Sequence, residues 1–177
     1  MNKKEIFTLS NIISLIRFLL AIPIFWAISE NQSMLALILI VVAALSDWLD
    51  GYFARKWKQI TSLGKIIDPL ADKSCTVGGF LALSLYQGLP FWITAIIIGR
   101  DIIIIIASII VIGQKNVVMA SNIPGKISVF LITLLGVVFL MNIEFMEQPL
   151  LILAGLAIAV SLINYGTIFF KNFPDKR

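Results

Sequence analysis

The 177-residue sequence contains no histidine and a single cysteine, Cys75. One cysteine offers no disulfide partner within the chain and forms no metal-binding pattern. The absence of histidine and of a second cysteine also argues against a structural zinc ion, which needs several such ligands. We expect Cys75 to be a small apolar packing residue.

Charge is scarce as well. Charged residues make up 14% of the chain, 59% of residues are hydrophobic, and the mean hydropathy is +0.99, which excludes an ordinary soluble globular domain. Apolar windows of about 20 residues, the length that crosses roughly 30 Å of hydrocarbon, recur along nearly the whole sequence. The sequence therefore predicts an all-α, polytopic membrane protein with one membrane-embedded domain, residues 1–177.

Short polar segments with turn-forming residues divide the apolar sequence into six predicted transmembrane helices. Their predicted ranges are 9–30, 34–54, 64–86, 91–113, 123–142 and 147–170. We find no internal repeat in the sequence.

Lys and Arg are missing from three of the five predicted loops and gather at both chain ends and in the two alternate loops. Because basic residues in short loops stay on the cytoplasmic side, both termini are predicted to be cytoplasmic. This topology, together with attraction to anionic lipid headgroups, explains the net charge of +4 and the pI of about 9.3 without a nucleic-acid partner.

Four aspartates lie within the second and third predicted spans, where an ionisable residue is costly unless it is paired, bound to an ion or in contact with water. Asp47 and Asp50 are three residues apart, and Asp68 and Asp72 are four apart, so each pair lies on one face of its helix. The short connecting segment 55–62 makes the two helices antiparallel neighbours. We therefore expect the four carboxylates to converge between them.

Carboxylates that face each other at low dielectric repel, so a cation must be part of such a site. Oxygen ligands suit Mg²⁺ or Mn²⁺, with Ca²⁺ as the larger competitor. Four carboxylates are enough to hold two divalent ions about 4 Å apart, an arrangement that clamps a phosphoryl group during displacement. A proton relay or a divalent-cation transporter also places carboxylates within spans, but a transporter more often shows repeats and broken helices.

Small and basic residues accompany the aspartates. Gly51, Ala54 and Gly64 would let a diphosphate approach the helix backbones, and Arg55 supplies a planar cation for its oxygens. Thr61 either caps the third helix or meets an anion at its positive end. Helix rise places this site inside the membrane but open to the cytoplasm, where a lipid diphosphate is a suitable ligand.

These residues stand at the spacing D-x2-D-G-x2-A-R-x8-G-x3-D-x3-D over residues 47–72, which resembles the signature of the CDP-alcohol phosphotransferase (CDP-alcohol phosphatidyltransferase) family, membrane enzymes of phospholipid biosynthesis. The resemblance implies a six-helix homodimer in which all four aspartates bind two metal ions and Asp72 is also the general base. It further implies contacts to the nucleotide of CDP-diacylglycerol, made by Gly51, Arg55, Thr61 and the first-helix residues Ser10, Asn11, Ile12 and Ile13.

The acceptor must be recognised by the other helices, whose candidate cations are Arg17, Arg100 and Lys126. Cations near a metal site favour an anionic acceptor, most simply a phosphate. The stretches IIIGRDIII and SNIPGKIS resemble those of phosphatidylglycerophosphate synthases, which implies glycerol 3-phosphate as acceptor and phosphate contacts from Arg100, Lys126 and Ser121. Inositol phosphate, serine and phosphatidylglycerol remain alternative acceptors, and Arg100 also has Asp101 beside it as an ion-pair partner.

Three positions depart from the pattern of that branch. Asn122 stands where a second Lys is expected, Ser14 replaces a Thr, and Ser128 follows Gly-Lys-Ile where Lys-Thr is expected. These departures concern the acceptor pocket and leave the reaction class unchanged.

Overall fold

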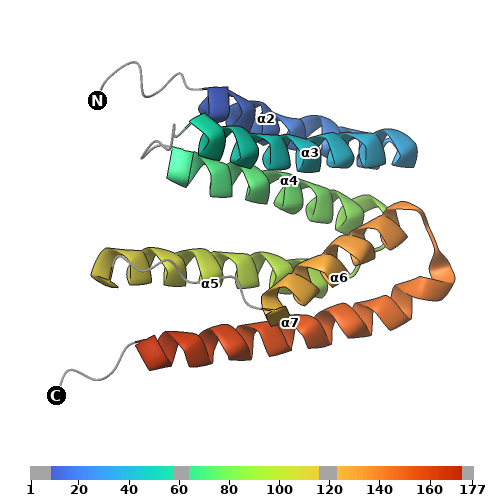
Figure 1. The fold of residues 1–177 in the computed structure, drawn as a ribbon. Coiled ribbons are helices and arrows are strands. Elements are labelled where there is room, and N and C mark those ends of the chain that lie inside the picture. Colours follow the sequence, from blue (N-terminus) through green and yellow to red (C-terminus); the bar gives the residue numbers. More distant parts are fainter. Residues whose placement is uncertain (1–8, 58–63, 116–122, 173–177) are drawn as a thin grey trace. The chain divides into compact units, whose positions relative to one another are not determined.

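The computed structural model describes residues 9–57, 64–115 and 123–172, and within them the side chains of residues 13–47, 49, 71, 73–106 and 123–167. These residues form six helices and no strand (Figure 1). The helices are α2 (Leu9–Ser29), α3 (Ser33–Trp57), α4 (Gly64–Tyr86), α5 (Phe91–Lys115), α6 (Ile123–Leu140) and α7 (Glu144–Asn172).

Each of the six predicted segments is confirmed as a helix. The main differences are that α3 continues to Trp57 instead of ending at 54, and that α7 begins at Glu144 instead of 147. The early start of α7 has a local reason, because Glu144 and Glu147 both lie in its first turn, where negative charge interacts favourably with the helix dipole.

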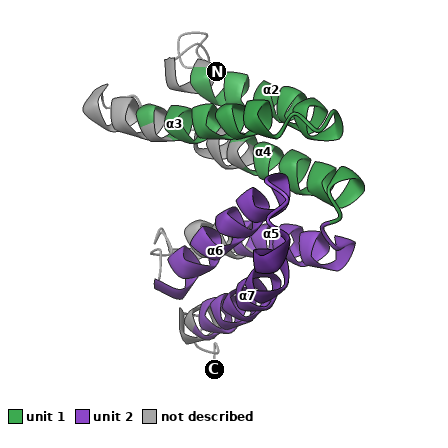
Figure 2. Cartoon of the chain, turned by 90° about the vertical axis from the view of Figure 1, so that its right-hand side faces the viewer, with its two compact units in different colours: residues 1–88 green, residues 89–177 purple. Residues whose placement is uncertain are grey.

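The helices fall into two compact units, residues 1–88 and 89–177, coloured separately in Figure 2. In the first unit α2 packs along both α3 and α4, while α3 and α4 touch each other at fewer positions. At Gly78 the helices α2 and α4 lie close together: a Cβ atom there would lie 3.4 Å from the carbonyl oxygen of Ala21, in ordinary van der Waals contact. Gly78 is thus a contact point between these two helices.

Asparagine residues end two of the helices. Asn31 and Asn142 have φ angles of 56° and 53°, the left-handed conformation that asparagine tolerates better than most residues. After α2, the amide of Asn31 bonds to the carbonyl of Ile28 and that of Gln32 to Ala27; the same pair of bonds recurs after α6. This is the Schellman pattern, and it turns the chain tightly from α2 into α3 and from α6 into α7.

In the second unit, α6 and α7 pack against each other, and α5 also contacts α7. The buried side chains of α6 include Ile132, Leu135 and Phe139, and those of α7 include Ala154 and Ile158. Their spacing of three or four residues places them on one face of each helix. The second unit therefore has its own apolar core.

Among the described residues, two helical segments are long and apolar enough to cross a membrane, Ile123–Leu140 and Glu144–Thr167. Shorter apolar segments are Ile13–Ser29 and Ser33–Asp47. Large apolar side chains are also exposed along these helices, such as Ile22, Phe130 and Ile163 at 68%, 65% and 67%. Exposed apolar surface of this extent is typical of a membrane or interaction surface.

Candidate active site

The four aspartates of the motif lie on two helices of the first unit. Asp47 and Asp50 are in α3, and Asp68 and Asp72 are in α4. The helical backbone on which the spacing argument depends is therefore present at all four positions. Of the four side chains, the structure describes that of Asp47. Within the described residues, no group of three or more His, Cys, Asp or Glu residues is placed to hold a metal ion.

Asp47 is held by a residue of the first helix. Nη1 of Arg17 donates a hydrogen bond to Oδ1 of Asp47 at 2.7 Å. The Arg17 side chain is 1% exposed, whereas that of Asp47 is 57% exposed. The ion pair thus joins a buried cation to a carboxylate that remains accessible to a further ligand, because the described bond uses one of its two oxygens.

Arg17 also connects α2 with α4 through its backbone. The thiol of Cys75 donates to the carbonyl oxygen of Arg17 at 3.0 Å, and Cys75 is a free, partly buried cysteine. Residue 17 therefore contacts both helices that carry the aspartates. The sequence had placed Arg17 among candidates for the acceptor, whereas the structure places its guanidinium on the first aspartate of the motif.

The predicted nucleotide contacts lie at neighbouring helix ends. Ser10, Asn11 and Ile12 are in the first turn of α2 and Ile13 follows them, partly buried. Gly51, Ala54 and Arg55 lie in the last turns of α3, and Gly64 begins α4. Among these residues, the described side chain is that of Ile13. Thr61 lies outside the described residues.

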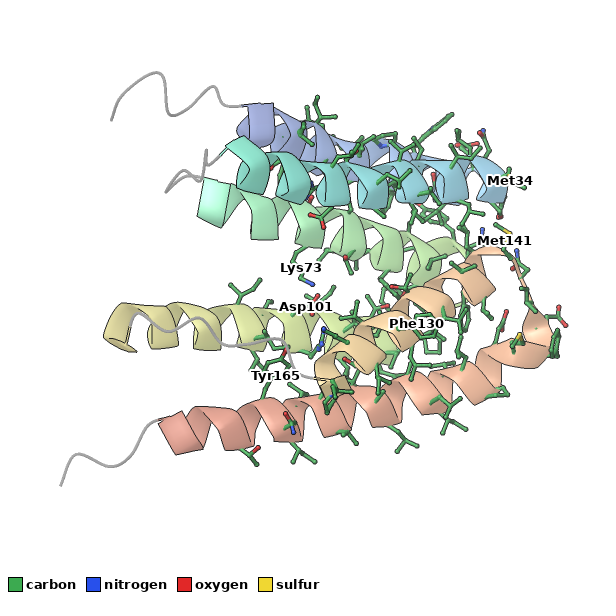
Figure 3. All side chains as sticks on the ribbon, viewed as in Figure 1. Met34, Lys73, Asp101, Phe130, Met141 and Tyr165 are labelled. Atoms are coloured by element: carbon green, nitrogen blue, oxygen red, sulfur yellow. The ribbon has the colours of Figure 1, made fainter. Side chains whose placement is uncertain are left out.

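A second polar cluster is buried in the second unit, around Arg100. Its Nη1 donates to Oδ1 of Asp101 at 2.8 Å, and its Nη2 donates to Oγ of Ser128 at 2.9 Å. Arg100 and Asp101 are 5% and 7% exposed, and Ser128 is 0% exposed. Asp101 is labelled on α5 in Figure 3. The ion pair between Arg100 and Asp101, which the sequence offered as an alternative to acceptor binding, is therefore present in the structure. It uses Nη1 of the guanidinium, so the other nitrogens can bond to other partners.

The other predicted acceptor residues are placed differently. Lys126 is exposed on α6, two residues before Ser128 and so about 200° around the helix from it. Ser121 lies outside the described residues. Sequence reasoning noted Ser128 as a departure from the expected pattern and missed its contact with Arg100. The sequence signal that could have pointed to this contact is a hydroxyl residue within one apolar helix and an arginine within another.

The chain matches the family model for CDP-alcohol phosphatidyltransferases over residues 7–164. A CDP-diacylglycerol--glycerol-3-phosphate 3-phosphatidyltransferase of Aquifex aeolicus is 34% identical over 170 residues, covering 91% of this chain and 95% of that protein. A protein of the same name from Bacillus subtilis is 32% identical over 140 residues, covering 77% of this chain and 72% of the relative. A CMP-forming cardiolipin synthase of Streptomyces coelicolor is 32% identical over 109 residues, covering 58% of this chain and 50% of that synthase.

This chain belongs to the CDP-alcohol phosphatidyltransferase family. The matched range includes the complete aspartate motif and runs through both compact units. The family is membrane-associated and uses divalent metal ions. The resemblance carried by the motif is thus confirmed, and membership favours an enzyme over a divalent-cation transporter.

Proposed function

We propose that this protein transfers the phosphatidyl group of CDP-diacylglycerol to glycerol 3-phosphate, giving phosphatidylglycerophosphate and CMP. The observation that carries this proposal is the match to the Aquifex aeolicus phosphatidyltransferase along 95% of that protein's length. It extends beyond the aspartate motif to the helices of the second unit, from which the predicted acceptor contacts come. The 177 residues would act as a single catalytic domain.

The donor site is proposed at the cytoplasmic ends of the first three helices. Arg55, Thr61 and the first turn of α2 would bind the cytidine diphosphate, and Gly51 and Gly64 would let it approach the backbone. Ala54 would serve the same close approach. In support, α2 packs along both α3 and α4, so these helix segments belong to one compact unit.

The donor set suits two Mg²⁺ or Mn²⁺ ions, because all four motif residues are carboxylates and the described one, Asp47, is accessible despite its bond to Arg17. Asp47, Asp50, Asp68 and Asp72 would hold the ions. When bound, the ions would neutralise charge on the diphosphate. With no histidine and a single cysteine, the chain lacks the several nitrogen and sulfur ligands of a structural zinc site.

Asp72 is proposed as the general base. Its carboxylate would take the proton from the acceptor hydroxyl, and the resulting alkoxide oxygen would attack the phosphorus that bears the lipid. The bond from this phosphorus to the bridging oxygen would break, and CMP would leave with that oxygen. Arg55 would balance the charge on the leaving group. The scheme requires no covalent enzyme intermediate.

Glycerol 3-phosphate would be held through its phosphate by Arg100, Lys126 and Ser121. The support from the structure is the buried guanidinium of Arg100, which is fixed at both terminal nitrogens and keeps a further N–H donor, Nε. A guanidinium suits phosphate because its donors form a planar fork.

We further propose that all six helices span the cytoplasmic membrane, with both termini and the active site facing the cytoplasm, and that the enzyme is a homodimer. The distribution of Lys and Arg supports the orientation. The exposed apolar side chains on α2, α6 and α7 support contact with lipid.

The Streptomyces relative supports phosphatidylglycerol as a second candidate acceptor. An acceptor panel separates the two. Purified full-length protein with CDP-diacylglycerol and Mg²⁺ or Mn²⁺ should release CMP when glycerol 3-phosphate is added. Release with phosphatidylglycerol and not with glycerol 3-phosphate would replace the first candidate by the second. Inositol phosphate and serine complete the panel.

A further inference from the structure

Ser128 occupies an unusual position in α6, because its hydroxyl is completely buried and has two partners. Its oxygen accepts the hydrogen bond from Nη2 of Arg100 at 2.9 Å, and its own proton is donated to the carbonyl oxygen of Gly125 at 3.0 Å. The bond to Gly125 fixes the direction of the hydroxyl proton. A lone pair of the oxygen is thereby kept for Arg100.

The guanidinium of Arg100 is held from two directions. Nη1 bonds to Asp101 in the same helix, and Nη2 bonds to Ser128, so α6 supplies a contact that α5 alone does not. Within the described part of the chain, Nε of Arg100 is buried without a hydrogen-bond partner. A buried N–H group without an acceptor is costly, and in a native protein it calls for an explanation.

We infer that Ser128 is a positioning residue for the acceptor: it fixes the guanidinium of Arg100 so that Nε stays available to an anionic oxygen, the phosphate of the phosphorylated alcohol. This inference rests on the proposed function, which supplies the acceptor. Ser128 stands where the pattern of phosphatidylglycerophosphate synthases has Lys-Thr. It adds no positive charge of its own, and in this inference it contributes to acceptor binding by positioning the charge of Arg100.

A purely structural role would have Ser128 join α5 to α6 without any effect on substrate. The two roles differ in kinetics. A positioning residue changes the KM for the acceptor and leaves the KM for CDP-diacylglycerol unchanged, whereas a structural defect lowers thermal stability and affects both substrates. The two roles also differ in what a replacement residue with a hydroxyl group restores: for a positioning residue, it selectively restores the KM for the acceptor.

The first test uses Ser128→Ala in the full-length protein, with Ser161→Ala as the matched control. Ser161 is also 0% exposed and lies in the same unit, but its Oγ is buried without a partner in the described structure. We expect Ser128→Ala to raise the KM for glycerol 3-phosphate by roughly fivefold to tenfold, the loss that removal of one ordinary intramolecular hydrogen bond gives. The KM for CDP-diacylglycerol should stay within about twofold, and Ser161→Ala should change neither.

A second pair of variants tests whether a change in KM comes from loss of the hydroxyl or from a folding defect. Ser128→Thr and Ser128→Val add the same volume to the buried site, and only the first keeps the hydroxyl. Ser128→Thr should therefore have a lower KM for glycerol 3-phosphate than Ser128→Val. Equal values in this pair, or an unchanged acceptor KM in a folded Ser128→Ala protein, would overturn the inference.

A binding measurement distinguishes this inference from the proposed function. Thermal stabilisation of the purified protein by glycerol 3-phosphate reports binding without turnover, and it should be weaker in Ser128→Ala than in wild type. If the wild type uses phosphatidylglycerol instead, the proposed acceptor is wrong, and the role of Ser128 stands only if its removal selectively weakens that acceptor. If no member of the acceptor panel stabilises the wild type, the inference fails.

Discussion

Nη1 of Arg17 lies 2.7 Å from Oδ1 of Asp47, and this contact joins the first helix to the first carboxylate of the family motif. The two partners differ in environment, since Arg17 is 1% exposed and Asp47 is 57% exposed. Each partner serves the other: Asp47 compensates a buried positive charge, and Arg17 orients the carboxylate. The contact therefore links the stability of the first unit to the geometry of the site.

Replacing Asp47 should reveal this link. In EDTA, where no divalent ion contributes, Asp47→Ala should lower the free energy of unfolding by about 1 to 2 kcal/mol, because a buried guanidinium loses a charged partner. Asp47→Asn, which keeps an oxygen acceptor, should lose less. Thermal unfolding followed by circular dichroism in detergent measures both. Identical unfolding of the wild type and Asp47→Ala would show that the ion pair does not stabilise the fold.

Asp72→Asn should remove the proposed general base. We expect turnover to fall by a factor of roughly 10² to 10⁴, the usual contribution of general base catalysis, with CDP-diacylglycerol affinity changed only a few-fold. The assay is CMP release, paired with direct binding of the lipid. Asp175→Asn makes the same change outside the motif and should be fully active. Turnover of Asp72→Asn within a few-fold of wild type would remove Asp72 from this role.

Removal of divalent ions should stop the reaction without unfolding the helices. Chelation should abolish CMP release, and added Mg²⁺ or Mn²⁺ should restore it, since charge on the diphosphate must be neutralised. Asp50→Asn and Asp68→Asn should each bind Mn²⁺ more weakly, which electron paramagnetic resonance measures independently of activity. Full activity in chelator would contradict the proposed two-ion site.

The proposed membrane orientation can be tested by labelling single cysteines on either side of the membrane. In a Cys75→Ser background, Gln32→Cys should react with an impermeant maleimide added to intact cells, because the loop after α2 is predicted to face outward. Lys58→Cys should react only after the membrane is permeabilised. Labelling of Lys58→Cys in intact cells would reverse the proposed orientation.

The sequence predicted the helices well, for physical reasons that are local. Apolar windows determine the helical segments, and residues such as Asn31, Asn142 and Gly88 mark their ends, each with a positive φ angle in the structure. Such signals lie within a few residues of the feature that they predict. Helix boundaries were accordingly close even where α3 and α7 proved longer than expected.

The polar contacts between helices were less accessible to sequence reasoning. Arg17 and Asp47 are 30 residues apart, and their meeting depends on how α2 is rotated against α3, which hydropathy does not specify. The contact between Arg100 and Ser128 likewise joins residues 28 apart. The motif correctly predicted the family, whereas the partners of Arg17 and Arg100 could be identified only from the structure.

The most direct test of the account is the mass of the lipid product. Purified protein incubated with CDP-diacylglycerol, a divalent ion and glycerol 3-phosphate labelled with ¹³C at every carbon should yield phosphatidylglycerophosphate that carries the complete labelled glycerol phosphate, with one CMP released for each product molecule. Absence of this labelled lipid, while CMP is released with a different acceptor, would contradict the proposed reaction.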